Sequence, residues 1–108
     1  MENPVKCTFS TNWNNKLNCD YFTTLRLYSK KFIVGHTYDI ELKSKHFKFA
    51  ECRGIKVLNI EEINEYIAGL DTGYDVDETK KLIKTMYKNL NLDWTTQRLV
   101  FVLFKTVN

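Results

Sequence analysis

The chain has 108 residues, a formal net charge of +3 and 44% hydrophobic residues. This length suits a single core and is too short for two, so we expect residues 1–108 to form one domain. No apolar run approaches the roughly 20 residues that span a bilayer, and the start of the chain lacks the apolar core of a signal peptide, so we expect a cytoplasmic protein with no membrane partner.

The cysteines and histidines give no sign of a disulfide framework or a metal centre. Cys7, Cys19 and Cys52 are odd in number and far apart, which favours free thiols in a reducing compartment. His36 and His46 have no cysteine or acidic residue at the spacing of metal ligands. The sequence therefore predicts no metal site and no cofactor.

The first part of the chain predicts a strand followed by a turn. Residues 5–11 alternate apolar and polar side chains, as a half-buried strand does. Residues 12–20 hold four asparagines, which favour turns over long helices. Because Trp13 and Leu17 are four positions apart, we expect a short helical turn with both side chains packed inward.

The most informative run is residues 22–27, a predicted strand in which Leu25 and Leu27 alternate with Thr24 and Arg26. Side chains two positions apart on a strand share a face, so the Thr24 hydroxyl and the Arg26 guanidinium point the same way. Such a face is either simply solvated or lines a cleft that binds an anion.

Three further strands are expected. Residues 36–43 form one, and Ser44–Lys45 follows as a polar turn. Residues 47–60 form a long bent strand or two strands that share a bulge, because the alternation breaks near Gly54. Residues 97–107 are almost continuously apolar, which predicts a central strand covered on both faces.

Two helices are predicted before that last strand. Asn59 with Glu62 three residues later is a capping-box pattern and starts the first helix, and Gly73 ends it. Asp75 starts the second helix in the same way. The expected apolar faces, which we assign to core packing, are Ile60, Ile63, Ile67 and Leu70 on the first helix and Leu82, Ile83, Met86, Tyr87 and Leu90 on the second.

The order of these elements predicts an α+β fold. Strands dominate, and the helices are inserted before the last strand, so we expect a small, closed or half-closed β-barrel of five to six strands with helical cover. A short helical turn near the N-terminus completes the predicted architecture.

Charge is distributed unevenly along the chain. Residues 26–56 hold eight lysines and arginines against three acids, whereas residues 61–78 hold seven acids and no base. A basic half of this kind either steers a polyanion toward the protein or is an ordinary solvated surface. The basic residues are Arg26, Lys30, Lys31, Lys43, Lys45, Lys48, Arg53 and Lys56.

The order and spacing of several short motifs resemble the ASCH domains, a family within the PUA-like barrel superfamily. Each motif is short, and the resemblance depends on their succession over residues 22–107. The matching pieces are Thr24-Leu-Arg26, Gly35 with Tyr38-Asp-Ile40, Asp71-Thr-Gly-Tyr74 followed by Glu78 and Tyr87, and the terminal Leu99-Val-Phe-Val-Leu-Phe104.

The resemblance implies a PUA-like barrel whose cleft accepts RNA or a nucleotide-sized ligand. Some small bacterial members resemble amidohydrolases that act on an N4-acylated cytidine nucleoside, using a threonine nucleophile, a lysine three residues earlier and a carboxylate before the second helix. The threonine matches Thr24, the nearby arginine matches Arg26, and the carboxylate falls at Asp71 or Thr72. The lysine position holds Tyr21, and tyrosine is in general a poor substitute for a neutral amine as a base at neutral pH.

The leading hypothesis is a binding module for single-stranded RNA, a nucleotide or a nucleoside, centred on Thr24, Arg26 and Asp71. In it Arg26 contacts a phosphate or base edge and Thr24 adds a hydroxyl; the alternative for Arg26 is a structural ion pair with Asp71. Further ligand contacts are expected from Tyr21 and Tyr74 by stacking and from Lys30, Lys31, Lys45 and Arg53 on the backbone.

Two alternatives stay open. One is an amidohydrolase with Thr24 as nucleophile and Asp71 as its orienting carboxylate; Lys16 could reach in from the preceding turn, although nothing in the sequence places it there. The other is a phage or mobile-element module that binds a protein through the acidic residues Glu61, Glu62 and Glu65. We expect a binding module rather than an enzyme.

Overall fold

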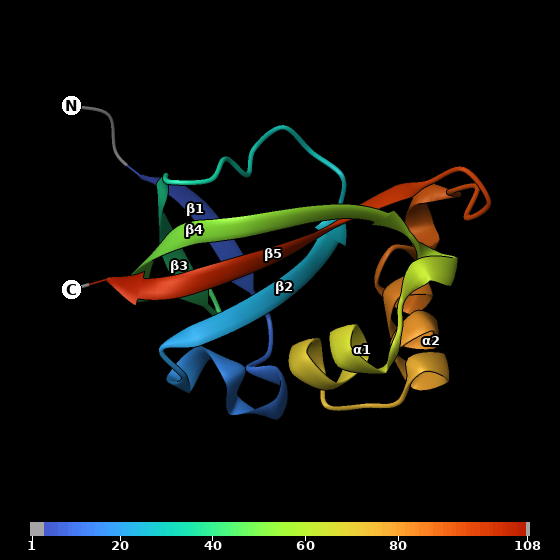
Figure 1. Cartoon of the computed structure of the whole chain (residues 1–108), viewed down its shortest axis with the longest axis horizontal. Coiled ribbons are helices and arrows are strands. Elements are labelled where there is room, and N and C mark those ends of the chain that lie inside the picture. The colour runs from blue at the N-terminus through green and yellow to red at the C-terminus, as the bar shows by residue number, and fades with distance from the viewer. Residues whose placement is uncertain (1–3, 108) are drawn as a thin grey trace.

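The computed structural model describes residues 4–107 as an α+β half-barrel (Figure 1). Five strands form one mixed sheet in the order β1-β3-β4-β5-β2, in which only β1 and β3 run parallel. The elements in chain order are β1 (Val5–Phe9), η1 (Trp13–Asn18), β2 (Tyr21–Leu27), β3 (Thr37–Leu42), β4 (Lys45–Asn59), η2 (Ile60–Glu62), α1 (Glu65–Asp71), α2 (Val76–Met86), η3 (Lys88–Leu90) and β5 (Arg98–Val107).

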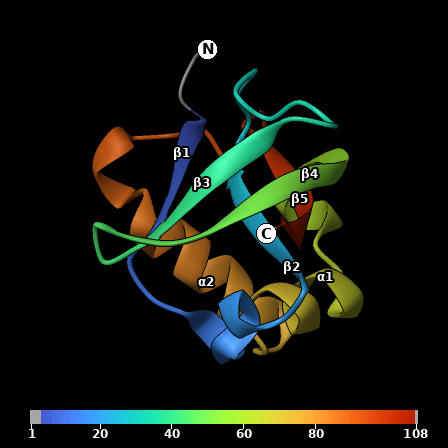
Figure 2. The ribbon, with the colours of Figure 1, turned by 90° about the vertical axis from the view of Figure 1, so that its left-hand side faces the viewer.

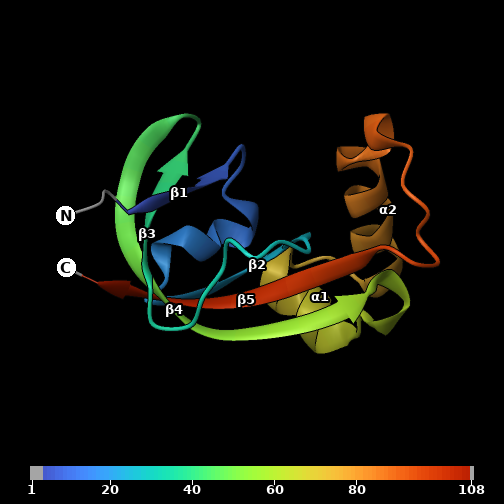
Figure 3. The ribbon, with the colours of Figure 1, turned by 90° about the horizontal axis from the view of Figure 1, so that it is seen from above.

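The sheet curls because β4 is long and bent (Figures 2 and 3). Its 15 residues pair with β3 on one side and with β5 on the other. The register against β5 shifts between Cys52 and Gly54, so Arg53 is the extra residue of a bulge. Bulges bend a strand and increase its twist. The bent strand predicted around Gly54 is therefore confirmed.

Two apolar clusters hold the fold together. One fills the concave side of the barrel. There the ring centroid of Phe104 lies 5.3 Å from that of Phe22 and 5.5 Å from that of Tyr38. The other lies between the sheet and the helices and includes Leu58 and Leu99, which face each other across β4 and β5. The central position predicted for the last strand is confirmed, since β5 lies between β4 and β2.

The first helix begins later than the sequence predicts, and the second begins where it is expected. The capping box of Asn59 and Glu62 forms, but it starts only the three-residue turn η2. The chain is extended again at Ile63, and α1 starts after Asn64, whose side chain accepts a hydrogen bond from the Ile67 backbone N–H. Helix α2 begins as expected, with the Asp75 carboxylate accepting from the Glu78 backbone N–H.

The apolar faces of the helices are only partly buried. Ile67 and Ile83 are buried, whereas Leu70, Met86 and Leu90 are 60%, 53% and 56% exposed. The assignment of these three side chains to core packing is therefore wrong. Helices this short cannot turn every apolar residue toward one sheet.

No helix among residues 4–107 is long and apolar enough to cross a membrane.

The turn after α1 depends on glycine. Gly73 has φ +80°, a conformation that costs other residues roughly 1–2 kcal/mol. A Cβ atom placed there would lie 2.9 Å from Cγ of Asn14, so the turn also packs directly against η1. Gly73 therefore sets how closely the end of α1 approaches η1.

We expect Gly73→Ala to lower the free energy of unfolding by more than about 1 kcal/mol, because a strained φ and a steric clash act together. Gly69→Ala in α1 is the matched control, since its Cβ would meet nothing within 4 Å. It should be neutral or stabilise by about 0.5–1 kcal/mol, the usual difference between alanine and glycine in a helix. Urea denaturation of both variants checks this, and equal stabilities would contradict it.

Candidate functional site

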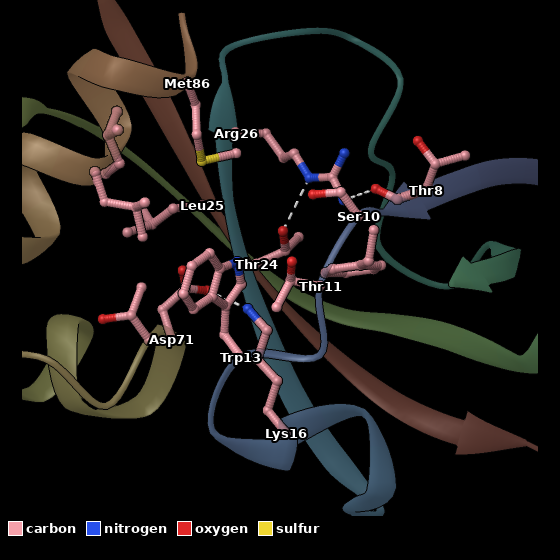
Figure 4. A pocket seen from close by; sticks show the side chains of 14 residues that line it. Thr8, Ser10, Thr11, Trp13, Lys16, Thr24, Leu25, Arg26, Asp71 and Met86 are labelled. Carbon is pink, nitrogen blue, oxygen red and sulfur yellow. Dashed lines mark hydrogen bonds and ion pairs between the residues drawn. The ribbon is translucent and has the colours of Figure 1, made fainter. Parts of the chain in front are cut away.

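A cavity of about 220 Å³ opens where the ends of β1 and β2, the turn η1 and the two α-helices meet (Figure 4). We name it the Thr24 cavity. Its buried lining mixes polar and apolar side chains, and its exposed lining is polar except for Met86. It is lined by Thr8, Phe9, Ser10, Thr11, Trp13, Lys16, Thr24, Leu25, Arg26, Asp71, Thr72, Leu82, Ile83 and Met86.

Arg26 connects the two edge strands across this cavity. Its Nε donates to Thr24 Oγ1 at 2.9 Å, and its Nη2 donates to the backbone carbonyl of Thr8 in β1. The guanidinium carbon also lies 4.7 Å from the centroid of the Phe9 ring, a cation–π distance. Because β1 and β2 are the two ends of the sheet, Arg26 spans the open side of the half-barrel.

The floor of the cavity holds a buried ion pair. Lys16 Nζ donates to Asp71 Oδ1 at 2.9 Å, and the two residues are only 5% and 6% exposed. Thr23 Oγ1 donates to the same carboxylate oxygen at 3.2 Å. Lys16 reaches this position because η1 turns back under β2, helped by left-handed backbone at Asn14 and Asn15.

The position of Asp71 at the end of α1 is fixed from the helical side as well. The hydroxyl of the next residue, Thr72, donates to the Ala68 carbonyl, and it shares a hydrogen bond of 2.9 Å with the hydroxyl of Thr79 in α2. Thr79 is fully buried. This contact ties the ends of the two helices together, so that Asp71 faces the sheet.

Burial shifts both groups of the pair toward their neutral forms. Burial lowers the pKa of Lys16, and the Asp71 carboxylate opposes this shift. Burial also raises the pKa of Asp71, against the opposing effects of the Lys16 charge and of the hydrogen bonds from Lys16 and Thr23. Both directions follow from the loss of hydration of a charge in a low-dielectric interior. A lysine with a lowered pKa in a cavity is a recognised feature of functional sites.

The three residues at the centre of the predicted cleft are brought together. Thr24, Arg26 and Asp71 all line the Thr24 cavity. The alternative for Arg26, an ion pair with Asp71, is not found; Lys16 occupies that place. Their roles in binding or catalysis remain predictions.

The other predicted contact residues lie elsewhere. Tyr21 is 51% exposed and lines a different cavity, while Tyr74 packs edge-on against Trp13 with ring centroids 5.8 Å apart. The basic residues also lie away from the Thr24 cavity: Lys30 and Lys31 follow β2, Lys45 starts β4, and Arg53 lies in the bulge with Glu51 3.4 Å away.

The acidic residues of the proposed protein-binding surface are exposed and partly engaged. Glu61 lies 3.3 Å from Lys80, Glu62 completes the capping box with Asn59, and Glu65 stands in the first turn of α1. These contacts within the chain do not test the protein-binding hypothesis, which stays a prediction.

Sequence patterns missed several residues that line the Thr24 cavity. Lys16 was considered as an amine that could reach in from the asparagine-rich turn, but no pattern placed it there, and Trp13 was assigned to packing. Met86 was assigned to the core, although its side chain stands at the mouth of the cavity (Figure 4). Within residues 4–107 no three histidine, cysteine, aspartate or glutamate side chains gather as metal ligands would.

Comparisons with known proteins support the fold. No protein-family model matches the sequence, and no curated protein is significantly similar to it. Among solved structures, a protein of the DUF984 family from Enterococcus faecalis matches with a TM-score of 0.72 at 13% identity, over 99% of this chain and 82% of that one. An ASCH domain from Lactobacillus crispatus matches with a TM-score of 0.67 at 16% identity, over 94% and 78% of the two chains.

These two similarities establish an ASCH-like fold for the chain, as the succession of motifs predicted. At such identities they show the fold alone. Whether the cavity binds a ligand or supports a reaction has to be argued from its own side chains.

We expect Lys16→Met to lower the free energy of unfolding by about 3–5 kcal/mol, because it leaves the buried Asp71 carboxylate without a charged partner. Without the amine, the raised pKa of Asp71 moves higher still. The folded variant then holds this proton more tightly than the unfolded chain, so its stability should fall as pH rises from about 4 through the folded pKa.

Urea denaturation at several pH values measures both effects. Lys80→Met is the control, since its pair with the exposed Glu61 should contribute less than about 1 kcal/mol. A Lys16→Met protein as stable as the unaltered one at pH 8, or one that gains stability with rising pH, would show that the buried pair is not formed.

Proposed function

We propose that the Thr24 cavity binds a nucleoside or a single nucleotide rather than a length of RNA. The observation that carries this proposal is the cavity itself, with its polar floor of Lys16, Thr24 and Arg26. Its volume of about 220 Å³ lies below the roughly 300–1,000 Å³ of pockets for drug-sized ligands. A base with part of its sugar suits that space.

Charge and ring contacts support the same class of ligand. Among residues 4–107 no carboxylate lies within ion-pair distance of Arg26, so its charge is available to a phosphate or to the carbonyl edge of a base. At the mouth, the half-buried Trp13 and the exposed Met86 offer apolar surface to a planar ring. The lysines that would follow an RNA backbone lie away from the cavity.

The fluorescence of Trp13 reports binding directly if Trp94 is first replaced by phenylalanine. We expect cytidine or cytidine monophosphate to change this fluorescence saturably. Arg26→Gln should weaken binding by about tenfold or more, the usual effect of losing a hydrogen bond to a charged group. The double variant Lys30→Ala/Lys31→Ala should leave the affinity unchanged, because neither lysine lines the cavity.

An oligonucleotide of single-stranded RNA serves as the competing probe. Each phosphate contact steepens the dependence of binding on salt, so a single nucleotide should show a shallow dependence. Tighter binding of the oligonucleotide with a steep salt dependence, lost in the double lysine variant, would overturn the proposal in favour of an RNA-binding surface.

A second candidate is hydrolysis of an N4-acylated cytidine, which the resemblance to ASCH domains implies. One observation favours it: Lys16 brings an amine to the cavity although Tyr21 occupies the position of the family lysine. Because burial lowers the pKa of Lys16, its neutral form is more accessible as a base for a threonine hydroxyl. Arg26 would hold the Thr24 oxygen in place.

Incubation with N4-acetylcytidine, followed by chromatography of the released cytidine, tests this candidate. We expect turnover that falls by about a hundredfold or more in Lys16→Met, the usual contribution of a general base. Lys84→Met, which removes an exposed lysine of α2, should leave turnover unchanged. Absence of turnover by the folded, unaltered protein would eliminate the hydrolase. Nucleoside binding would still be decided separately, by the Trp13 fluorescence titration.

A further inference from the structure

A second cavity lies on the other side of the buried ion pair. It measures about 230 Å³, and Lys16 is the residue that it shares with the Thr24 cavity. We name it the Thr23 cavity. Its lining residues are Asn14, Lys16, Cys19, Tyr21, Phe22, Thr23, Gly69, Leu70 and Leu103.

The two adjacent threonines of β2 differ in the hydrogen bonds that their hydroxyls make. Successive side chains of a strand point to opposite faces, and Thr23 and Thr24 accordingly line different cavities. Thr23 Oγ1 donates its proton to Asp71 Oδ1 at 3.2 Å. Thr24 Oγ1 instead accepts a hydrogen bond from Arg26, and the side-chain hydrogen bonds of residues 4–107 give its proton no acceptor.

Only Thr23 therefore meets the geometric requirement for an activated hydroxyl. A threonine becomes nucleophilic when a base within hydrogen-bond reach takes its proton, and when a third group orients that base. Asp71 is that base for Thr23, and Lys16, 2.9 Å from the same carboxylate oxygen, is the orienting group. All three residues are at most 6% exposed, so bulk water competes little for these hydrogen bonds.

We propose that Thr23, with Asp71 and Lys16, forms a nucleophilic site that accepts an acyl group from a carboxylic ester or amide bound in the Thr23 cavity. This site opens on a different cavity from the proposed nucleoside site and does not depend on nucleoside binding. It also departs from the resemblance to ASCH domains, which assigns the nucleophile to Thr24.

The acyl group is expected to be short and apolar. The walls of the Thr23 cavity carry Tyr21, Leu70 and Leu103, which are 51%, 60% and 36% exposed and so remain available to an apolar chain. Of its polar side chains, those of Lys16 and Thr23 are buried at the inner end, whereas Asn14 and the free Cys19 are exposed. An apolar wall with a few convergent polar groups is the usual form of a small-molecule site.

The acyl transfer proceeds in two balanced steps. The Thr23 oxygen bonds to the carbonyl carbon while its proton passes to the Asp71 carboxylate, and the carbonyl oxygen, now negative, accepts an N–H from Lys16. The C=O bond then re-forms as the bond to the leaving group breaks; an alcohol or amine leaves with the proton from Asp71, whereas a phenolate leaves as the anion and Asp71 loses its proton to solvent. Water later attacks the Thr23 ester; one of its protons passes through Asp71 to the Thr23 oxygen as the ester C–O bond breaks, and the carboxylic acid leaves.

Labelling with 4-nitrophenyl butyrate and mass spectrometry test this assignment. Cleavage after Lys16 and Arg26 by trypsin yields the peptide Leu17–Arg26, which contains both threonines, and fragmentation of this peptide locates the butyryl group. We expect the label on Thr23. It should be lost in Thr23→Val and kept in Thr23→Ser and in Thr37→Val, a control that removes the hydroxyl of an exposed strand threonine lining neither cavity.

Each other outcome overturns the proposal. A label on Thr24 would support the assignment implied by the ASCH resemblance, and a label only on lysines would show ordinary surface acylation. No label on either threonine of the folded, unaltered protein would show that Asp71 does not activate Thr23. Because the site of labelling in the unaltered protein decides the question, a variant that fails to fold leaves the test intact.

Discussion

The ion pair between Lys16 and Asp71 is the contact on which the arrangement of this small domain depends. It joins residues 55 positions apart and so fixes the turn η1 and the end of α1 against the edge strand β2. Removing two charges from water costs several kcal/mol each, and an apolar pair of similar size would often serve stability as well. The pair therefore contributes mainly position: it holds η1 and the end of α1 in one arrangement against β2.

The open side of the half-barrel explains why a site forms there. Within residues 4–107, the two end strands of the sheet, β1 and β2, have no strand paired to their outer edges, and the sheet curls so that β1 and β2 border its open side (Figure 2). Arg26 bridges them through a side chain instead of a backbone ladder. A side-chain bridge leaves space between the strands, whereas a continuous ladder would close it. The cavity is therefore a consequence of incomplete closure.

Local patterns predicted the strands well and the site only in part. Alternation placed Thr24 and Arg26 on one face, and the break near Gly54 marked the bulge of β4. Lys16 could not be placed, because its direction depends on left-handed backbone at Asn14 and Asn15 and on a partner 55 residues away. Helical periodicity likewise could not show that the Met86 side chain stays exposed and lines the cavity. Long-range contacts decide both outcomes.

The distribution of charge in space argues for small ligands more strongly than its distribution along the chain. Of the eight basic residues between positions 26 and 56, only Arg26 lines the Thr24 cavity. Since Lys16 and Asp71 compensate each other, Arg26 supplies the net charge there. One positive charge complements one anionic group, whereas a nucleic-acid strand needs a row of them. On the opposite face of β2 the pair meets Thr23 in a cavity with apolar walls at Leu70 and Leu103, which we propose accepts an uncharged carbonyl. One buried ion pair thus separates two cavities with different chemical preferences.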